Sequence, residues 1–166
     1  MYLRKKSAFV VLLAAGISLV PALSKADGAY SPTRDGGNFG LGLELGDPGT
    51  WGVSGKVWVD HENAFQGAVK FPGGSALLQL DYLWHDFHLI HMKSTEGEWP
   101  FYIGVGGDLS TNNPVQVAGR VPIGMSYIFD KRNVPVDIFI QLVPTLWLTQ
   151  PTDFYLYGEF GAHYYF

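Results

Sequence analysis

The sequence contains no cysteine among its 166 residues. This absence excludes a disulfide-stapled fold, a thiolate metal centre, a cysteine nucleophile and a cysteine-linked lipid anchor. Charged residues are also scarce, at 16%, against about 25% in soluble domains. The apolar content of 47% excludes a disordered chain, and the length predicts a single domain.

The first 26 residues have the order of an export signal. A basic run, residues 4–6, precedes an apolar stretch, residues 7–23, and small residues follow at Ser24 and Ala26. This order predicts a secretory signal peptide that is cleaved after Ala26. A membrane-anchoring helix is the alternative, but the stretch is shorter than the ~20 residues needed to span a bilayer and contains Pro21.

Removal of the signal peptide makes the chain more acidic. It leaves 166 − 26 = 140 residues, with seven basic and 15 acidic side chains and a net charge of 7 − 15 = −8. No cluster of Lys and Arg remains, which excludes a nucleic-acid partner. No remaining apolar run is long enough for a transmembrane helix. We divide the rest into a polar lead-in, residues 27–36, and one domain, residues 37–166.

Apolar and polar residues alternate with period two along most of this domain, which predicts strands with two different faces. In the first such segment, Phe39, Leu41 and Leu43 alternate with Gly40 and Gly42. The pattern predicts eight strands, at residues 39–46, 51–60, 64–71, 77–85, 101–109, 115–129, 136–149 and 155–166. Eight strands of 9–11 residues use about 80 residues, whereas twelve would leave almost none for turns, so a wide porin is excluded.

The polar face of the strands indicates which face points inward. A soluble lipocalin-like barrel would carry many Lys, Glu, Asp, Ser and Thr on a solvated outer face, and such a face is the alternative interpretation. Here that face carries mainly glycine with isolated charges, which suits a narrow lumen and the reversed arrangement of a membrane barrel. We expect its charged residues to form an ion network that fills the lumen: Glu44, Lys56, Lys70, Asp81, Asp108, Arg120, Asp137 and Glu159.

Aromatic residues lie at or near the ends of the predicted strands, where a transmembrane barrel has its two interfacial girdles. These residues are Trp51, Trp84, Trp99, Phe101, Phe129, Tyr164, Tyr165 and Phe166. Two prolines, Pro122 and Pro144, lie inside predicted strands. A closed barrel has no edge strand, so each proline removes a ladder hydrogen bond. We expect a bulge or a lateral opening at each.

Two groups of residues have types that could support chemistry. His85, His88 and His91 are the densest potential ligands for Zn²⁺ or Ni²⁺, but their spacing is equally that of a polar strand end and turn, and we expect no metal or other cofactor. A serine, histidine and acid for hydrolysis are available among Ser54, Ser126, Glu159 and His163. No nucleophile motif such as G-x-S-x-G is present, so we expect no enzyme activity.

The last segment, residues 155–166, ends in an aromatic residue after alternating apolar ones: Phe160, Ala162, Tyr164 and Phe166. It resembles the last strand of bacterial outer-membrane β-barrels, and the chain resembles the small eight-stranded group that includes the OmpA membrane domain, OmpX and OmpW. The resemblance implies a closed, antiparallel, up-and-down transmembrane barrel in the cell outer membrane. It also implies that Phe160, Tyr164 and Phe166 are the signal read by the barrel-assembly machinery.

The expected function is that of a small integral outer-membrane protein without a wide pore. Its role is structural or, at most, the passage of a small or hydrophobic solute. Its expected partners are outer-membrane lipid, the barrel-assembly machinery and periplasmic chaperones, and we expect a monomer. The alternatives are a soluble periplasmic barrel that binds an apolar ligand and an outer-membrane enzyme that modifies lipids. The short loops depart from the resembled group and weigh against adhesion or receptor binding.

Overall fold

The structure is a computed structural model that describes residues 31–33, 36–46, 49–89, 97–129, 134–149 and 151–166. The predicted signal peptide and most of the lead-in lie outside these residues. The described chain is all-β, and its strands are β1 (Phe39–Gly46), β2 (Thr50–Trp58), β3 (Asn63–Lys70), β4 (Leu77–Asp86), β5 (Gly97–Glu98), β6 (Phe101–Ser110), β7 (Gln116–Arg120), β8 (Ile123–Phe129), β9 (Val136–Trp147) and β10 (Asp153–Tyr165). In this part of the chain, no helix is long and apolar enough to cross a membrane.

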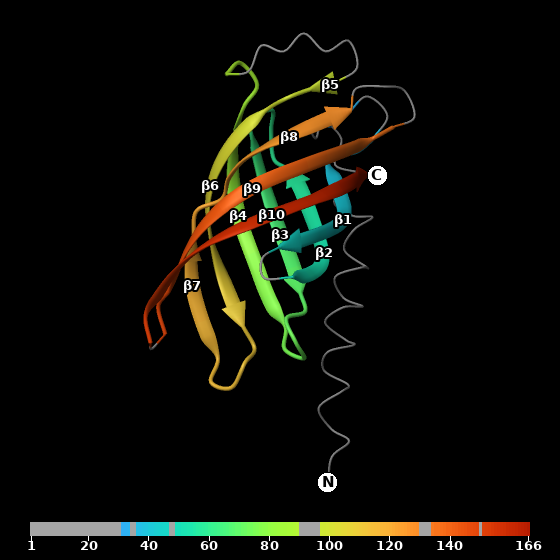
Figure 1. The fold of residues 1–166 in the computed structure, drawn as a ribbon. Coiled ribbons are helices and arrows are strands. Elements are labelled where there is room, and N and C mark those ends of the chain that lie inside the picture. The colour runs from blue at the N-terminus through green and yellow to red at the C-terminus, as the bar shows by residue number, and fades with distance from the viewer. Residues whose placement is uncertain (1–30, 34–35, 47–48, 90–96, 130–133, 150) are drawn as a thin grey trace.

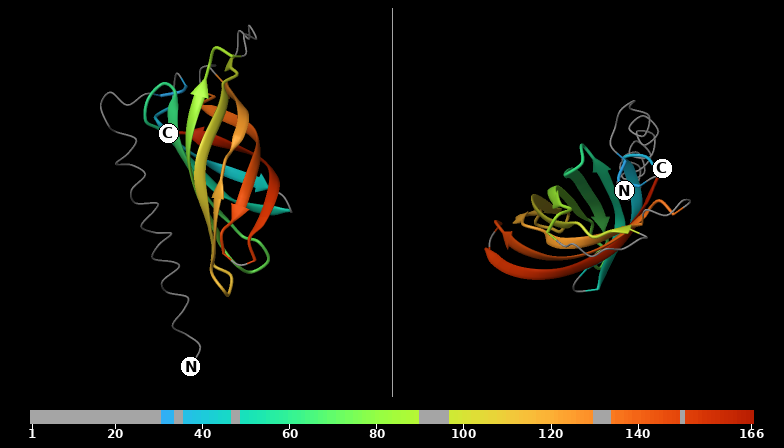
Figure 2. Two further views of the ribbon diagram at one scale, coloured as in Figure 1. Left: turned by 90° about the vertical axis from the view of Figure 1, so that its left-hand side faces the viewer. Right: turned by 90° about the horizontal axis from the view of Figure 1, so that it is seen from above.

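The strands close into a barrel in which β10 pairs with both β9 and β1 (Figures 1 and 2). All pairings are antiparallel. β7 and β8 are two parts of one strand, because both pair with β6 and with β9, and β5 only extends the sheet beside β8. The wall therefore has eight strands, and the predicted eight-stranded antiparallel barrel is confirmed.

The strands are strongly staggered around the barrel. Paired residues, followed once round the wall from β10, are His163, Gly42, Ser54, Ala68, Gln79, Asp108, Ala118, Trp147 and Asp153. The path returns to β10 at a displacement of 163 − 153 = 10 residues. Such a stagger goes with strands tilted by roughly 35–45° and an interior that side chains fill.

The barrel has two different ends. We call the end formed by the turns β1–β2, β3–β4, β6–β7 and β9–β10 the hairpin end. We call the opposite end, where β1 begins and β10 finishes, the terminal end. In Figure 1 the hairpin end lies at the bottom and the terminal end at the top. The connection between β4 and β6, which is the longest in the barrel, belongs to the terminal end.

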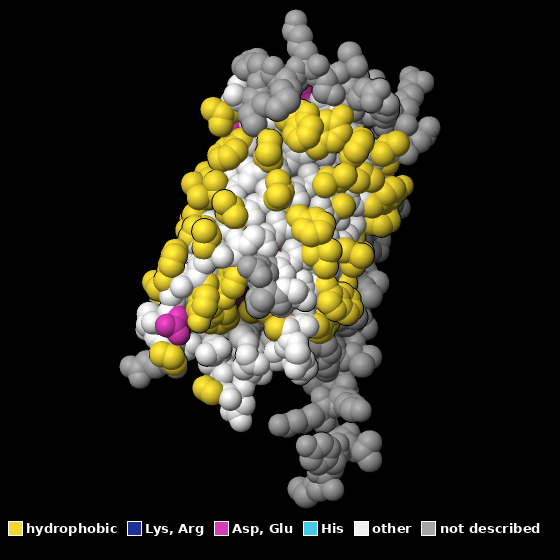
Figure 3. All heavy atoms as spheres, in the orientation of Figure 1, with side chains coloured by type: hydrophobic (Ala, Val, Ile, Leu, Met, Phe, Trp, Pro, Cys, Tyr) yellow, Lys and Arg dark blue, Asp and Glu magenta, His cyan; other side chains and the backbone are white. Residues whose placement is uncertain are grey.

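Side chains alternate between the lumen and the outer surface along the wall strands, except at the start of β10, where residues 153–156 are all exposed. Most outward side chains are large and apolar, and every wall strand carries exposed ones, which together form a belt. Figure 3 shows the part of this belt on one face of the barrel. Some aromatics instead point inward at the terminal end and are fully buried: Trp58, Tyr102, Phe139 and Tyr165. Of the aromatics expected in a girdle, Tyr165 is thus a lumen residue, since its strand position has the opposite parity to Tyr164 and Phe166.

The two prolines interrupt hydrogen bonds without changing the register. Ile103 faces Ile123, and three residues further on Gly106 faces Arg120, so no extra residue is inserted and the expected bulge at Pro122 is absent. The Gly104 N–H donates to the Pro122 carbonyl over 2.8 Å. Since paired residues exchange two such bonds, the missing Pro122 N–H removes the return bond.

The same loss occurs one strand further along the wall. The Val121 N–H donates to the Pro144 carbonyl over 3.0 Å, and Pro144 has no N–H to return. The register between β7 and β9 continues unchanged between β8 and β9, so Pro144 causes no bulge either. Two neighbouring seams of the wall, β6–β8 and β7–β9, therefore each lack one ladder bond at the same height.

Candidate functional site in the barrel lumen

The structure places all eight predicted lumen charges inside the barrel, with residue exposures of 4% or less. They fall into two separate groups. The hairpin-side cluster comprises Glu44, Lys70, Asp81, Asp108, Arg120 and Glu159. The terminal-side cluster comprises Lys56 and Asp137 together with Ser54, Trp58, His163 and Tyr165.

Arg120 is the centre of the hairpin-side cluster. Its guanidinium Nε lies 3.2 Å from Asp81 Oδ1, and one terminal nitrogen lies 3.0 Å from Asp108 Oδ1. Its other terminal nitrogen donates to Glu159 Oε2 over 2.5 Å. One guanidinium thus contacts carboxylates from three different wall strands, a use for which its planar fork of donors is suited.

Lys70 links the rest of this cluster. Its Nζ lies 2.6 Å from Glu44 Oε1 and 2.6 Å from Glu159 Oε1, so Glu159 bridges both cations. Gln141 donates to Glu159 Oε2 over 2.6 Å, and Tyr102 donates to Gln141 Oε1 over 2.8 Å. With two cations and four carboxylates, the formal charge of the cluster is 2 − 4 = −2 when all groups are ionised.

Inward glycines make these contacts possible. Asp81 and Arg120 lie two strands apart and both pair with Gly106 on the strand between them. A Cβ at Gly106 would collide with the Asp81 carboxylate and the Leu80 carbonyl. Glu44 and Lys70 both pair with Gly52 in the same way. The missing side chain of the middle strand lets the two outer side chains meet above it.

In two further contacts, side chains from two strands also meet above an inward glycine of the strand between them. Tyr102 and Gln141 meet over Gly124, and Ser54 and His163 meet over Gly42. The inward glycines are therefore part of the lumen network rather than only a means of narrowing the barrel.

The terminal-side cluster is organised around one carboxylate. Asp137 Oδ1 lies 2.9 Å from His163 Nδ1, and its Oδ2 accepts a hydrogen bond from the Tyr165 hydroxyl over 2.8 Å. Lys56 Nζ lies 3.5 Å from Asp137 Oδ2. Lys56 also lies over the ring of Trp58, 4.8 Å from its centroid, and so gains a cation–π contact.

Ser54, His163 and Asp137 have the contact order of a catalytic triad. Ser54 Oγ lies 2.9 Å from His163 Nε2, and Asp137 orients the other ring nitrogen. A nucleophile must approach its substrate to about 3–3.5 Å, yet Ser54 is 1% exposed and the His163 ring is stacked on Phe139 at 5.0 Å. In these closed surroundings, the arrangement joins β2, β9 and β10 through hydrogen bonds.

Two residues considered for hydrolysis lie elsewhere. Glu159 belongs to the hairpin-side cluster. Ser126 is buried, and its Oγ has no hydrogen-bond partner within the described residues. The spacing of these residues in the sequence indicates neither that Ser54 contacts His163 nor that Glu159 and Ser126 lie apart from them. The contact between Ser54 and His163 depends on the pairing of β10 with β1, which closes the barrel.

Of the three histidines, His85 at the end of β4 and His88 just after it do not share a site. His85 is buried, with Nδ1 3.1 Å from the Glu62 carbonyl and its ring against Trp58 at 4.4 Å. His88 is exposed beside Asp86, and His91 lies outside the described residues. Among the described residues, no group of three or more His, Asp or Glu side chains is arranged to hold a metal ion.

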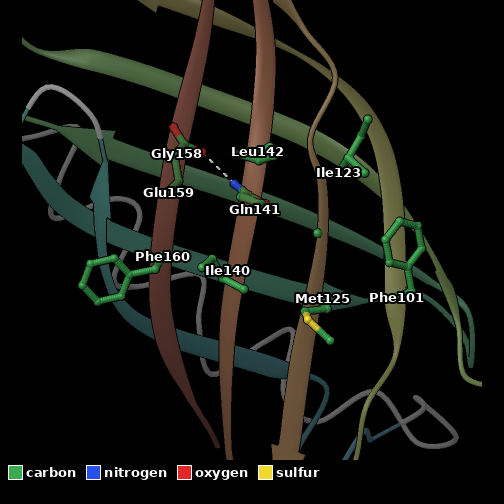
Figure 4. Close-up of a pocket in the computed structure, with 10 residues that line it drawn as sticks. Phe101, Ile123, Met125, Ile140, Gln141, Leu142, Gly158, Glu159 and Phe160 are labelled. Atoms are coloured by element: carbon green, nitrogen blue, oxygen red, sulfur yellow. Dashed lines mark hydrogen bonds between the residues drawn. The ribbon is translucent and has the colours of Figure 1, made fainter. Parts of the chain in front are cut away.

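The outer wall carries an apolar groove of about 450 Å³ across β6, β8, β9 and β10 (Figure 4). Two rows of paired residues form its sides: Phe101, Met125, Ile140 and Phe160 in one, and Ile123, Leu142 and Gly158 in the other. Gly158 leaves the second row incomplete on β10. The groove begins directly beside the wall segment that Pro122 interrupts.

The three aromatics of the predicted assembly signal point outward, Tyr164 and Phe166 at the terminal end and Phe160 further along β10, opposite Leu45 and Ile140. Phe160, Tyr164 and Phe166 are each about half exposed, and the Phe166 N–H donates to the Phe39 carbonyl over 3.0 Å. The final residue is thus tied to the first strand. Its role as an assembly signal stays a prediction.

Several residues of the lumen network were absent from the predicted charge network. They are Ser54, Trp58, Gln79, Tyr102, Gln141, His163 and Tyr165. All share the inward parity of the charged residues on their strands, and that parity is the signal that could have found them.

The fold and lumen define the chain as a closed, eight-stranded antiparallel barrel whose interior is filled by buried ion pairs. Comparison with known proteins finds no matching family model, no matching curated protein and no matching solved structure.

Proposed function

We propose that this chain is a small integral protein of a Gram-negative-type outer membrane, exported through a cleaved signal peptide and inserted with the help of periplasmic chaperones and the barrel-assembly machinery. The observation that carries this proposal is the belt of outward apolar side chains, which has members on every wall strand and is seen on one face in Figure 3. Monomeric soluble proteins rarely expose contiguous apolar patches larger than a few hundred Å². A lipid-facing wall requires such a belt.

The filled lumen supports a structural role over a wide pore. Ion pairs cross the lumen at two heights between strands three places apart in the wall: Lys56 on β2 with Asp137 on β9, and Lys70 on β3 with Glu159 on β10. The same filling weighs against the soluble lipocalin-like alternative, which needs an apolar interior for its ligand. It also weighs against the lipid-modifying enzyme, because the triad-like arrangement of Ser54, His163 and Asp137 is closed off from any substrate.

Membrane fractionation combined with an unboiled gel tests the proposal. The protein should stay in the carbonate-insoluble envelope fraction, and the folded barrel should migrate differently with and without boiling. Recovery in the soluble fraction would overturn the proposal. Swelling of vesicles that contain the protein tests the filled lumen, and rapid passage of uncharged sugars would contradict it.

A matched pair of leucine substitutions sharpens this test. Leu80 lies in the belt on β4, and Leu89 lies at the terminal end beyond β4, and both are 62% exposed. Leu80→Lys should reduce insertion, since a Lys in the middle of a lipid-facing strand costs about 2–4 kcal/mol. Leu89→Lys should have little effect. Equal behaviour of the two variants would argue for a water-facing wall.

The passage of a hydrophobic molecule through the side of the barrel is a second candidate. The interrupted ladder at Pro122 and Pro144 and the adjacent apolar groove favour it. Pro122→Val and Pro144→Val supply the missing N–H groups, so exchange of an apolar fluorescent probe across vesicles should slow in the double variant. Exchange at the rate of protein-free vesicles in the unaltered protein would exclude this role.

A further inference from the structure

The start of β10 has a neighbouring strand on one side only. β10 pairs with β9 from Asp153 onward, whereas Gly46, the last residue of β1, faces Glu159. On the far side of this hairpin, β9 is paired with β7 at the same height. Within the described residues, residues 153–156 therefore form an open sheet edge, and Figure 1 shows β10 continuing past the turn between β1 and β2.

The backbone groups of Phe154 and Leu156 point to this open edge. Along an antiparallel strand, residues that bond to one neighbour alternate with residues that bond to the other. The Pro144 carbonyl accepts from Val121 on the adjoining strand, so Leu156, which faces Pro144, directs its N–H and C=O away from β9. Phe154 has the same parity. Among the described residues, none lies beside these N–H and C=O groups to pair with them.

The edge lacks the features that keep edge strands from pairing with other chains. Proteins protect such edges with charged residues, prolines or bulges. Residues 154–158 read Phe-Tyr-Leu-Tyr-Gly, without a charge or a proline. The register with β9 also runs through this segment without interruption. The edge is thus open to the addition of a strand.

Both faces of the edge carry exposed apolar side chains. Phe154, Tyr155 and Leu156 have exposed fractions of 66%, 46% and 56%, although consecutive residues of the strand point to opposite faces. Hydrocarbon does not accommodate an open sheet edge, because water is absent there to satisfy its polar groups. Water does not favour contiguous apolar side chains. An added peptide strand meets both requirements, since it pairs with the backbone and covers the side chains.

We propose that this edge binds an extended segment of another protein, which pairs with Phe154 and Leu156 as an antiparallel strand in line with β1. The residues opposite positions 156, 155 and 154 are apolar, because directly opposite residues share a face of the sheet. The residue that follows them is a lysine or an arginine, since it lies opposite the exposed side chain of Asp153. The exclusion of hydrocarbon rests on the membrane location proposed above, whereas the open edge does not.

A second copy of the chain fits this edge less well than a different protein. Two identical edges pair antiparallel about a twofold axis perpendicular to the strands. The two barrels then point in opposite directions along the paired strands. Barrels that are inserted in one membrane with the same orientation cannot adopt this arrangement, so the occupant is a different chain.

A short labelled peptide tests the edge directly. Fluorescein-labelled Thr-Val-Tyr-Val-Lys amide places its apolar residues opposite Leu156, Tyr155 and Phe154 and its lysine opposite Asp153. Binding to the barrel in detergent micelles is followed by fluorescence anisotropy, with empty micelles as the blank, and we expect saturable binding.

Two isomers of this peptide separate strand pairing from apolar adhesion. Methyl groups on the amide nitrogens of both valines remove the donors that face β10, and should weaken binding by about tenfold or more. Methyl groups on the amide nitrogens of the tyrosine and the lysine face away from β10, and should leave the affinity nearly unchanged. Equal affinities of the two isomers would overturn the proposal.

Variants of the barrel test the same contact from the other side. Leu156→Pro removes an N–H of the open edge but no bond to β9, and proline is tolerated on edge strands. It should weaken binding by about fivefold or more, whereas Leu156→Val keeps the N–H and should retain binding. The unboiled gel band reports folding of both variants. Unchanged affinity in a folded Leu156→Pro barrel would overturn the proposal.

Asp153→Asn tests the site even where Leu156→Pro does not fold. It should weaken binding of the lysine peptide and leave unchanged that of a peptide with norleucine in place of lysine. An equal response of the two peptides would contradict the position of Asp153 in the site.

These outcomes are distinct from those of membrane fractionation. Absence of binding to a carbonate-insoluble barrel would overturn the peptide site and leave the membrane location standing. Binding by a protein recovered in the soluble fraction would overturn the location alone. A dimer of the unaltered barrel in detergent that is lost in Leu156→Pro would assign the edge to a second copy and overturn the proposal.

Discussion

The two lumen clusters balance charge in different ways. In the hairpin-side cluster, two cations serve four carboxylates, and each cation contacts more than one of them. In the terminal-side cluster, the single carboxylate of Asp137 is surrounded by donors from Lys56, His163 and Tyr165. The first cluster therefore depends on its cations, whereas the second has several donors that can partly replace one another.

The loss of Arg120 should show this dependence most strongly. Arg120→Met leaves Asp81, Asp108 and Glu159 without their shared cation in a buried site. Breaking a buried pair in this way costs about 3–5 kcal/mol of unfolding free energy. Urea titration of the barrel in detergent, followed by the unboiled gel band, measures the loss.

Arg120→Lys is the control for this prediction. It keeps the charge but cannot contact three carboxylates with a planar group. The stability of this variant should therefore lie between that of the unaltered protein and that of Arg120→Met. An Arg120→Met barrel as stable as the unaltered one would mean that the cluster contributes nothing to the fold.

A change at Asp137, the centre of the terminal-side cluster, should lower the unfolding free energy less than a change at Arg120. Asp137→Asn leaves Lys56 buried, but the Trp58 ring still faces the ammonium, so we expect a loss of about 2–3 kcal/mol. Adding Lys56→Met should recover most of it, because no unpaired charge then remains. The same urea titration checks both variants, and a double variant weaker than Asp137→Asn would contradict this explanation.

Glycines that face the lumen should be far less replaceable than those that face outward. Gly106→Ala forces a Cβ into the Asp81 carboxylate and the Leu80 carbonyl, and overpacking of this kind costs about 1–3 kcal/mol. Gly119 faces outward on the next strand and has no atom within 4 Å of an added Cβ. Gly119→Ala should therefore change stability by less than about 0.5 kcal/mol. Similar losses in the two would show that the contact over Gly106 does not matter.

The fold was predictable because the alternation of apolar and polar residues can be recognised within each strand by itself. Alternation in segments such as residues 39–46 marks both the strand and the face that points inward. That parity placed Glu44, Lys56 and Arg120 in the lumen without any knowledge of pairing. It equally marks Tyr165 as inward, although its position in a terminal aromatic run indicated a girdle.

The partners inside the lumen could not be predicted in the same way. Glu159 meets Lys70 only because the wall closes between β10 and β1, with a displacement of ten residues around the barrel. The sequence does not state that number. The role of the inward glycines also cannot be predicted without the strand register. Gly106 matters because it pairs with Asp81 on one side and Arg120 on the other, and lets their side chains meet. Local patterns determine faces, whereas pairs depend on the global stagger.

Among the lumen variants, the smallest expected loss of stability concerns Ser54, and this variant separates structure from chemistry in the terminal-side cluster. Ser54→Ala removes one buried hydrogen bond to His163 while Asp137 keeps the ring in place. Such a bond contributes about 1 kcal/mol, so the loss should be smaller than for Asp137→Asn. A fluorophosphonate probe should fail to label the folded protein, because the hydroxyl is closed off by the lumen walls. Labelling that disappears in Ser54→Ala would instead show that a substrate can reach the lumen, and the triad-like geometry would then be a functional one.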